Sequence, residues 1–430
     1  MLKYILIPLT VVLTANAETS VELDIQSSIE MAQKYSPLLK IEEVNIEQLE
    51  YDKRKALGMA LPQVSTEYTI NNFKTKPSYG GFSLNSDYER TVGVTVSQAL
   101  FTFGAVGNAV KAADAATVMA ELKQKLTQRE VIYLTKVSYY SVLLAEEQLK
   151  IAQGSLKNAQ DNLNILQNYF SSGRPPRGDV IRLQTDVALR KPQLEEAKSN
   201  LEQAKAQLKV VLGLKDDRNV VLKESFKTTF NKIDFNDLSN TLLNKELQVQ
   251  ALEQQIEFND RLRKAQRGKM LPSIGAFFSY SSSERSNKEI FDTDSTINSS
   301  VVGISVNWEI WNGGQNRAEY KKAIAEKTKA QIQLQKTKDD LYIQLKQTIQ
   351  SFNTLQKNIK SDMEAVKLAQ QSFRLSQNRF KAGKTSITEL NSTEQLLTQS
   401  KATLALHKYQ INQSYAVIQK LVQSAFGGKQ

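Results

Sequence analysis

The side chains that most often carry catalytic or metal chemistry are scarce in this chain. Its 430 residues include one histidine, His407, and no cysteine. Disulfides and thiolate metal sites are therefore excluded, and catalytic histidine dyads are strongly disfavoured. No pairing of a nucleophile with a base and no cluster of metal ligands stands out in the sequence. We expect no cofactor and no metal, and an enzyme is the least favoured class of function.

The first 17 residues, MLKYILIPLTVVLTANA, predict a cleaved export signal. Lys3 supplies positive charge, an apolar stretch follows, and Ala15 and Ala17 form a small-x-small cleavage site. The apolar stretch is too short to span a bilayer as a helix, and an N-terminal anchor is the weaker alternative. No later stretch of 18 apolar residues occurs. We therefore expect no transmembrane helix in the mature chain.

The chain is basic, with a formal net charge of +11. A nucleic-acid partner is one reading of such a charge. The lysines and arginines, however, are spread along helical segments rather than clustered, and the chain is predicted to be exported. We interpret them as solvated helix faces and expect no nucleic-acid partner.

The second half of the sequence repeats the first at a constant offset of 210 residues. Leu61-Pro62 recurs as Leu271-Pro272, and Gly58 recurs as Gly268. A period this long indicates a duplicated half-molecule rather than a solenoid repeat. We predict four parts: a signal (1–17), a first repeat (18–212), a linker (213–236) and a second repeat (237–430).

Most of each half follows a helical rhythm. Apolar residues at three- and four-residue steps predict long amphipathic helices over Ala105–Phe170 and Gln315–Phe380. At 1.5 Å per residue each would reach roughly 100 Å, so we expect an elongated protein. Shorter helices are predicted over Ile25–Gly58, Asp179–Leu212, Leu238–Gly268 and Ile387–Phe426. A glycine in each connection favours a helical hairpin tip, one near 170–178 and one near 380–388.

The remaining segments alternate apolar and polar residues with a period of two. They predict one strand pair within 61–101 and another within 271–311, joined by polar loops at Lys74–Glu89 and Glu284–Ser299. Strands of this length can cross a membrane when tilted, whereas hairpins packed on the protein's own helices are the alternative. Aromatic residues near the strand ends are candidates for the membrane interface: Tyr68, Phe101, Tyr280, Trp308 and Trp311.

Four strands are too few to close a barrel, since about eight are needed for one filled by side chains. An open sheet in lipid would leave unpaired edges, at a cost of several kcal/mol for each unsatisfied group. Several chains must therefore pool their strands if the sheet enters a membrane.

Taken together, these features resemble the TolC-type outer-membrane efflux protein family over essentially the whole mature chain. The resemblance rests on the duplicated Leu-Pro before each strand pair, and on the junctions LFTFGAVGNA and IWNGGQNRAE. It also rests on the tips YFSSGRPPRGDV and RFKAGKTSITEL. Each motif alone is loose, but both sets recur in order at one offset. The fold implied is mainly α with a membrane β part: a long α-helical barrel continuing a 12-stranded antiparallel β-barrel built from three chains, four strands per chain.

The resemblance implies a non-catalytic exit duct in the cell outer membrane, extending into the periplasm. Its partners would be two further copies of itself in a homotrimer, outer-membrane lipid, a periplasmic adaptor (membrane fusion protein) and an inner-membrane pump. Such a duct serves tripartite efflux or type I secretion. The segment 213–236 would form a belt around the helices.

The resemblance also assigns roles to residues at the two tips. Phe170, Gly173, Phe380 and Gly383 become candidates for contact with the adaptor, although the glycines also have a capping role. Glu389 and Ser392 become candidates for the pore constriction. Family members can carry two acidic residues three apart behind the second tip, and here only Glu389 is acidic. Its alternative role is a favourable charge at a helix N-terminus. Thr385 stands where a basic residue can occur in the family.

The main alternative is a periplasmic coiled-coil adaptor or another structural protein of an envelope complex. An adaptor predicts one helical hairpin flanked by domains rich in Gly and Val. This chain has two hairpins and few glycines outside its turns. The sequence therefore favours the channel.

Overall fold

The computed structural model describes residues 21–72, 78–79, 82–83, 88–170, 177–214, 218–231, 233–236, 238–239, 246–287 and 293–426. Within those ranges no helix combines the length with the apolar character that a membrane span requires. The predicted export signal, residues 1–17, lies outside them.

The chain forms two compact units, each assembled from separate segments. The first unit comprises residues 1–38, 128–238 and 344–430, and the second comprises 39–127 and 239–343. Both units therefore draw on both halves of the sequence.

The long helices agree closely with the sequence prediction. Helix α3 spans Ala105–Phe170 and α7 spans Gln315–Lys381, and each contributes residues to both units. Helix α4 spans Arg177–Leu212, α6 spans Leu247–Lys269 and α8 spans Ile387–Phe426. Helix α6 begins later than the predicted Leu238, and residues 240–245 before it lie outside the described ranges.

The predicted single helix over Ile25–Gly58 is wrong in one respect, because it is two helices. Helix α1 spans Ile25–Tyr35 and α2 spans Pro37–Gly58. Ser36 between them is extended, with φ −59° and ψ 124°. The proline that follows disfavours the helical conformation for the residue before it, which explains the break. Helix α1 begins with a capping box, in which the Asp24 carboxylate accepts the Ser27 N–H at 2.6 Å.

One apolar core cluster of the first unit lies where the ends of four helices meet. It combines apolar side chains from α3, α4, α7 and α8: Leu166, Leu183, Ala369, Phe373, Phe380, Ile387, Leu390 and Leu397. Each large side chain of this kind stabilises the fold by roughly 1.5–3 kcal/mol when fully buried.

A second packing centre of the first unit involves residues 218–231. Strand β6, Val220–Leu222, pairs in parallel with β1, Val21–Leu23. The Tyr139 hydroxyl donates to the Leu23 carbonyl at 3.2 Å and accepts the Glu224 N–H at 3.2 Å. Further along, the Phe230 ring packs edge-on against Phe352 of α7, with ring centroids 5.4 Å apart. The segment therefore contacts both α3 and α7.

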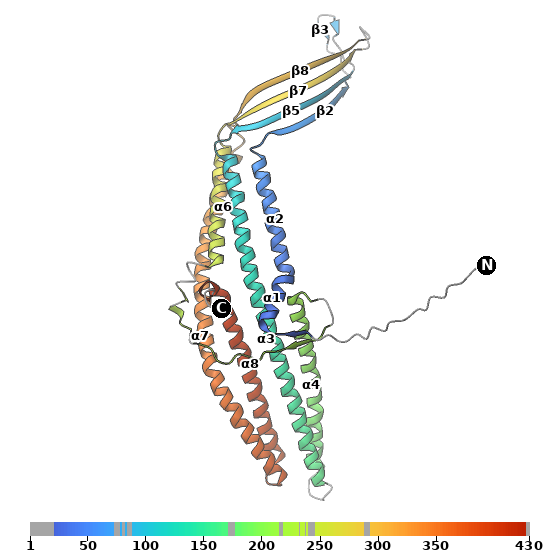
Figure 1. Cartoon of the computed structure of the whole chain (residues 1–430), viewed down its shortest axis with the longest axis vertical. Helices are drawn as coiled ribbons and strands as arrows, with labels where there is room; N and C mark the ends of the chain where they lie inside the picture. Colours follow the sequence, from blue (N-terminus) through green and yellow to red (C-terminus); the bar gives the residue numbers. More distant parts are fainter. Residues whose placement is uncertain are drawn as a thin grey trace, which may run out of the picture. The chain divides into compact units, whose positions relative to one another are not determined.

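The second unit carries a four-stranded antiparallel sheet in the order β2-β5-β7-β8 (Figure 1). Its strands span Gln63–Asn72, Tyr88–Phe101, Ser273–Asn287 and Thr293–Asn307. A register shift at Ala99–Phe101 marks a bulge in β5. Strands β2 and β8 are the edges of this sheet. Helices α2, α3, α6 and α7 continue from its strands in the same unit.

The two predicted loops contain more β structure than expected. Strand β7 extends to Asn287 and β8 begins at Thr293, so most of the predicted loop Glu284–Ser299 is paired hairpin. Within the other loop, the short strands β3 (Ser78–Tyr79) and β4 (Phe82–Ser83) pair with each other. The prediction relied on alternating apolar residues, but the hydrogen bonds between strands are made by the backbone. Strands rich in exposed serine and threonine can therefore pair without that alternation.

One glycine of the second unit is required by close packing. A Cβ atom on Gly268, in the last turn of α6, would lie 2.7 Å from the Ala105 nitrogen at the start of α3. At Gly58, its partner in the repeat, a Cβ atom would meet nothing within 4 Å. The same residue at equivalent positions therefore has a packing role in only one half.

Candidate functional site

The second hairpin tip is a tightly capped turn between α7 and α8. Gly383 adopts φ +66°, its N–H donates to the Phe380 carbonyl at 2.9 Å, and the Lys384 N–H donates to the Arg379 carbonyl at 2.8 Å. A left-handed residue at this position is the usual way to end a helix. Phe380, predicted as a contact residue, is buried in the core, whereas Gly383 is exposed.

Glu389, the predicted constriction residue, lies in the first turn of α8. Its side chain is 45% exposed and forms an ion pair with Arg379 at 3.0 Å. The Thr385 hydroxyl also donates to this carboxylate, and the Glu389 N–H donates to the Ser386 hydroxyl at 3.2 Å. Arg379 thus provides the positive charge that is absent at Thr385. Ser392, one turn further along, is exposed.

Only the flanks of the first tip are described. Helix α3 ends at Phe170 and α4 begins at Arg177, so the predicted contact residue Gly173 lies outside the described ranges. Behind this tip, the Arg182 guanidinium approaches the Thr388 hydroxyl of α8 at 3.5 Å. The roles predicted for the tips and for Glu389 stay predictions.

A buried ion pair that the sequence did not reveal joins α4 to α8 near these tips. Glu394 is 1% exposed and accepts two hydrogen bonds from the Arg190 guanidinium, one of them 2.8 Å long. Ser155 of α3 donates to Glu394 at 3.1 Å, and Asp186 forms a second ion pair with Arg190 at 3.1 Å. Burial lowers the pKa of Arg190, but the hydrogen bonds and charges of its two acidic partners outweigh burial and raise it. Arg190 therefore remains charged.

No local sequence signal identifies this pair. Arg190 and Glu394 are 204 residues apart, and the 210-residue repeat aligns them with Ser400 and Gln184, which are uncharged. The only available hint is an acidic residue at a position of the helical pattern that faces the core.

The five predicted interface aromatics are all exposed, but only three lie at strand ends. Phe101 ends β5, while Trp308 and Trp311 follow the end of β8, at the same end of the sheet. The Trp308 indole N–H donates to the Met270 carbonyl at 3.3 Å. Tyr68 and Tyr280 were expected near strand ends and lie mid-strand instead, where they pair with Val92 and Val94. Strand β7 extends beyond its predicted end, which places Tyr280 in its middle.

The described residues offer no constellation for metal chemistry. Among them, no group of three His, Cys, Asp or Glu residues is placed to hold a metal ion. His407 is instead paired through its Nδ1 with the Asp362 carboxylate of α7 at 2.5 Å.

Solved structures with the same fold define the class of protein. The chain superposes on the outer-membrane channel OprN with a TM-score of 0.80 at 15% identity, covering 93% of this chain and 89% of that one. The CmeC outer membrane channel of Campylobacter jejuni gives 0.79 at 16% identity, covering 93% and 85%. VceC, an outer membrane protein of Vibrio cholerae, gives 0.78 at 16% identity, covering 93% and 95%. The fold is that of these outer-membrane proteins.

The chain belongs to the outer membrane efflux protein family, whose model matches residues 28–214 and 238–422. Among characterised proteins it is 22% identical to the alkaline protease secretion protein AprF of Pseudomonas aeruginosa, over 65% of this chain and 60% of that protein. It is also 22% identical to SilC of Salmonella typhimurium, a probable outer membrane lipoprotein, over 74% and 68%. The chain therefore matches about 60% of the length of AprF. The family resemblance and the mainly α fold with four long strands per chain are confirmed.

Proposed function

We propose that this protein is the outer-membrane exit duct of a tripartite efflux or type I secretion system. Three chains form a homotrimer whose pooled strands make a 12-stranded barrel and whose helices continue as a tunnel into the periplasm. Substrates enter from an inner-membrane pump through a periplasmic adaptor. The duct catalyses no reaction and takes no cofactor, because it contributes only a channel and the constriction that closes it.

The four-stranded sheet is the observation that carries this proposal. Val302, Ile304 and Val306 of β8 share one face, and Val302 is 81% exposed. An apolar surface of this kind on a sheet needs a covering, which membrane lipid provides. Both edge strands also present unpaired backbone groups, and pairing β8 of one copy with β2 of the next satisfies them. One chain alone meets neither requirement.

The family and its relatives support the same proposal. One relative, AprF, is a protease secretion protein, and another, SilC, is a probable outer membrane lipoprotein. Both are consistent with an exit duct in the outer membrane. Membership of an efflux protein family also separates this chain from the adaptor alternative.

We also propose a structural role for the segment 213–236. Its described part ties helices together: Gln356 of α7 donates to the Phe230 carbonyl at 2.8 Å, and Asn412 of α8 donates to the Lys227 carbonyl at 2.9 Å. These contacts support a belt that holds the helices of the first unit. They also support the division into two repeats, 18–212 and 237–430, with this segment as the linker between them.

A planar-bilayer recording on the purified full chain tests the central proposal. We expect a homotrimer by native mass spectrometry and stepwise ion conductance after reconstitution. A stable monomer that inserts without conductance would overturn the proposal. Co-purification with a periplasmic adaptor expressed in the same cells tests the partner assignment separately.

A further inference from the structure

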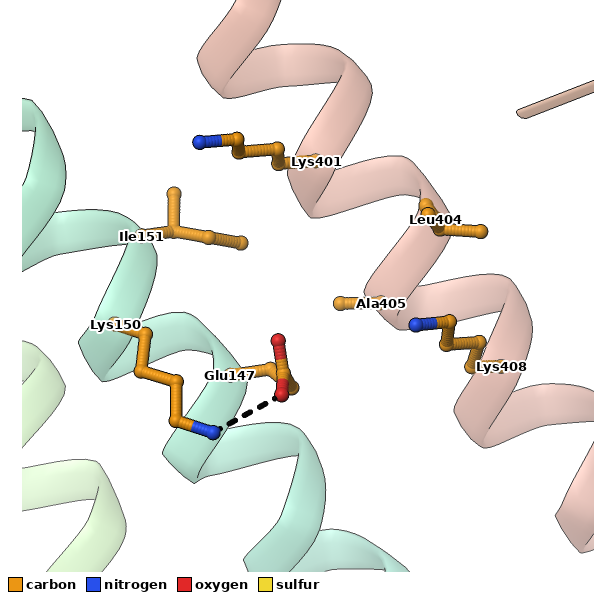
Figure 2. Close-up of a pocket in the computed structure, with 7 residues that line it drawn as sticks. All are labelled: Glu147, Lys150, Ile151, Lys401, Leu404, Ala405 and Lys408. Carbon is orange, nitrogen blue, oxygen red and sulfur yellow. Dashed lines mark hydrogen bonds and ion pairs between the residues drawn. The ribbon is translucent and has the colours of Figure 1, made fainter. Parts of the chain in front are cut away.

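A cavity of about 220 Å³ lies between α3 and α8 in the first unit. Its lining includes Glu147, Lys150, Ile151, Lys401, Ala405 and Lys408. In Figure 2 the side chains of Lys401, Ala405 and Lys408 extend from α8 toward α3, and that of Ile151 extends from α3 toward α8. The channel function proposed above uses none of these residues.

The charges around this cavity are unbalanced. Three ammonium groups face a single carboxylate, which leaves two positive charges in excess. Glu147 pairs with Lys150, its neighbour on α3, at 3.2 Å. Among the described residues, neither Lys401 nor Lys408 forms an ion pair with an acidic side chain. They lie seven residues apart on α8, which is two helical turns, so both project from the same face.

The cavity also has an apolar wall. Ile151 and the buried Ala405 line it between the charged groups. Apolar walls lower the local dielectric constant and strengthen the attraction between the ammonium groups and any anion that enters. The unpaired lysines repel each other for the same reason, and a bound anion relieves that repulsion.

We propose that this cavity binds a phosphate-type dianion, in the form of a phosphate monoester with a short apolar group. The two negative charges match the two excess ammonium charges, and lysine is a common phosphate ligand that acts as a point charge. The ester group packs on Ile151 and Ala405. Since Lys150 lies on α3 while Lys401 and Lys408 lie on α8, the bound anion joins the two helices.

Isothermal titration of the full chain in detergent with butyl phosphate tests the site. The titration is run at about pH 8, because the second pKa of such an ester is about 6. Ionic strength is matched with chloride, because screening weakens binding. We expect binding to the wild type, about fivefold weaker binding to Lys401→Gln or Lys408→Gln, and a larger loss in the double variant. Glu147→Gln should tighten binding about fivefold, a gain that misfolding cannot produce.

The matched control is Lys360→Gln, which removes the same charge from an exposed position on α7 and should leave binding unchanged. Parallel titrations with inorganic phosphate and with phosphatidic acid in mixed micelles separate a soluble ligand from a lipid head group. Either source supports the site if binding requires Lys401 and Lys408. Absence of binding by the wild type, or equal binding by the double variant, would overturn the proposal. Conductance does not enter this test, so its outcome is independent of the channel assignment.

Discussion

Removing one partner of the buried pair of Arg190 and Glu394 should destabilise the fold strongly, because the remaining charge would be buried without its partner. Replacing Glu394 with alanine removes the bidentate acceptor and the partner of Ser155 while Arg190 stays buried. Arg190 is 14% exposed, and its Nε–H already lacks a hydrogen-bond partner. Water therefore cannot easily replace the lost carboxylate.

The expected cost follows from this environment. Removing one partner of a buried ion pair destabilises a protein by about 3–5 kcal/mol. Asp186 still neutralises Arg190 at 3.1 Å after the substitution, so we place the cost at the lower end, about 3 kcal/mol. Replacing both partners by apolar groups removes the two charges that are most deeply buried, and such replacements are often neutral. Asp186 loses its partner in that variant, but its side chain is 24% exposed and can be solvated. The double variant Arg190→Met with Glu394→Leu should recover most of the loss.

Hydrogen–deuterium exchange of the first turns of α8 is the appropriate assay, because local opening there exposes the pair. A loss of about 3 kcal/mol corresponds to exchange that is roughly a hundredfold faster, since each 1.4 kcal/mol is a factor of ten. The control is Glu195→Gln on α4, which breaks an exposed pair with Lys198 and should change exchange little. The reasoning is wrong if Glu394→Ala exchanges within a few fold of the wild type, or if the double variant exchanges as fast as the single one.

Three further predictions concern other parts of the chain. Gly268→Ala should lower the free energy of unfolding by about 1–3 kcal/mol, because the added Cβ would clash with the Ala105 backbone. Gly58→Ala should be neutral or stabilising, because a Cβ there meets nothing. Similar denaturation midpoints for the two variants would contradict this. Hydrogen bonds, chiefly from Lys264, hold the pKa of Asp260 below its usual value, so its contribution is present above pH ~4 and is lost as the pH falls through the folded-state pKa. Asp260→Asn should therefore cost about 2 kcal/mol at neutral pH, and its melting curve should converge with that of the wild type only in strong acid. In planar bilayers Glu389→Gln should weaken cation preference while Arg379→Gln, which frees the carboxylate, should strengthen it; unchanged reversal potentials in both would reject the constriction role.

The elements that the sequence predicted well are those with long, regular periods. Helices α3 and α7 end within one residue of their predicted bounds, because apolar residues at helical spacing continue until a glycine-containing turn. Strand β2 was predicted at its observed length for the corresponding reason at period two. The break at Ser36 was missed even though Pro37 signals it, because the apolar pattern continues across the proline.

The candidate site was predictable only where it is local. Gly383 and Glu389 lie in one short stretch around the second tip, where the sequence shows both the glycine that ends α7 and the acidic residue that begins α8. Two other features depend on how helices far apart in sequence pack: the pairing of Arg190 with Glu394, and the cavity that Lys150 and Lys401 both line. No periodicity encodes that packing. The choice of Arg379 as the partner of Glu389 also depends on the turn geometry rather than on spacing alone.

The division of the chain into interleaved segments has a consequence for biogenesis. The first unit needs residues from the beginning, the middle and the last segment of the sequence, and the second unit needs two segments separated by more than a hundred residues. The first unit cannot be completed until the last segment has been delivered, and the second cannot be completed until the chain has been delivered to residue 343. Long loops must also close before either unit gains its packing. Export of this protein should therefore precede its folding, with the emerging chain kept extended until α8 has arrived.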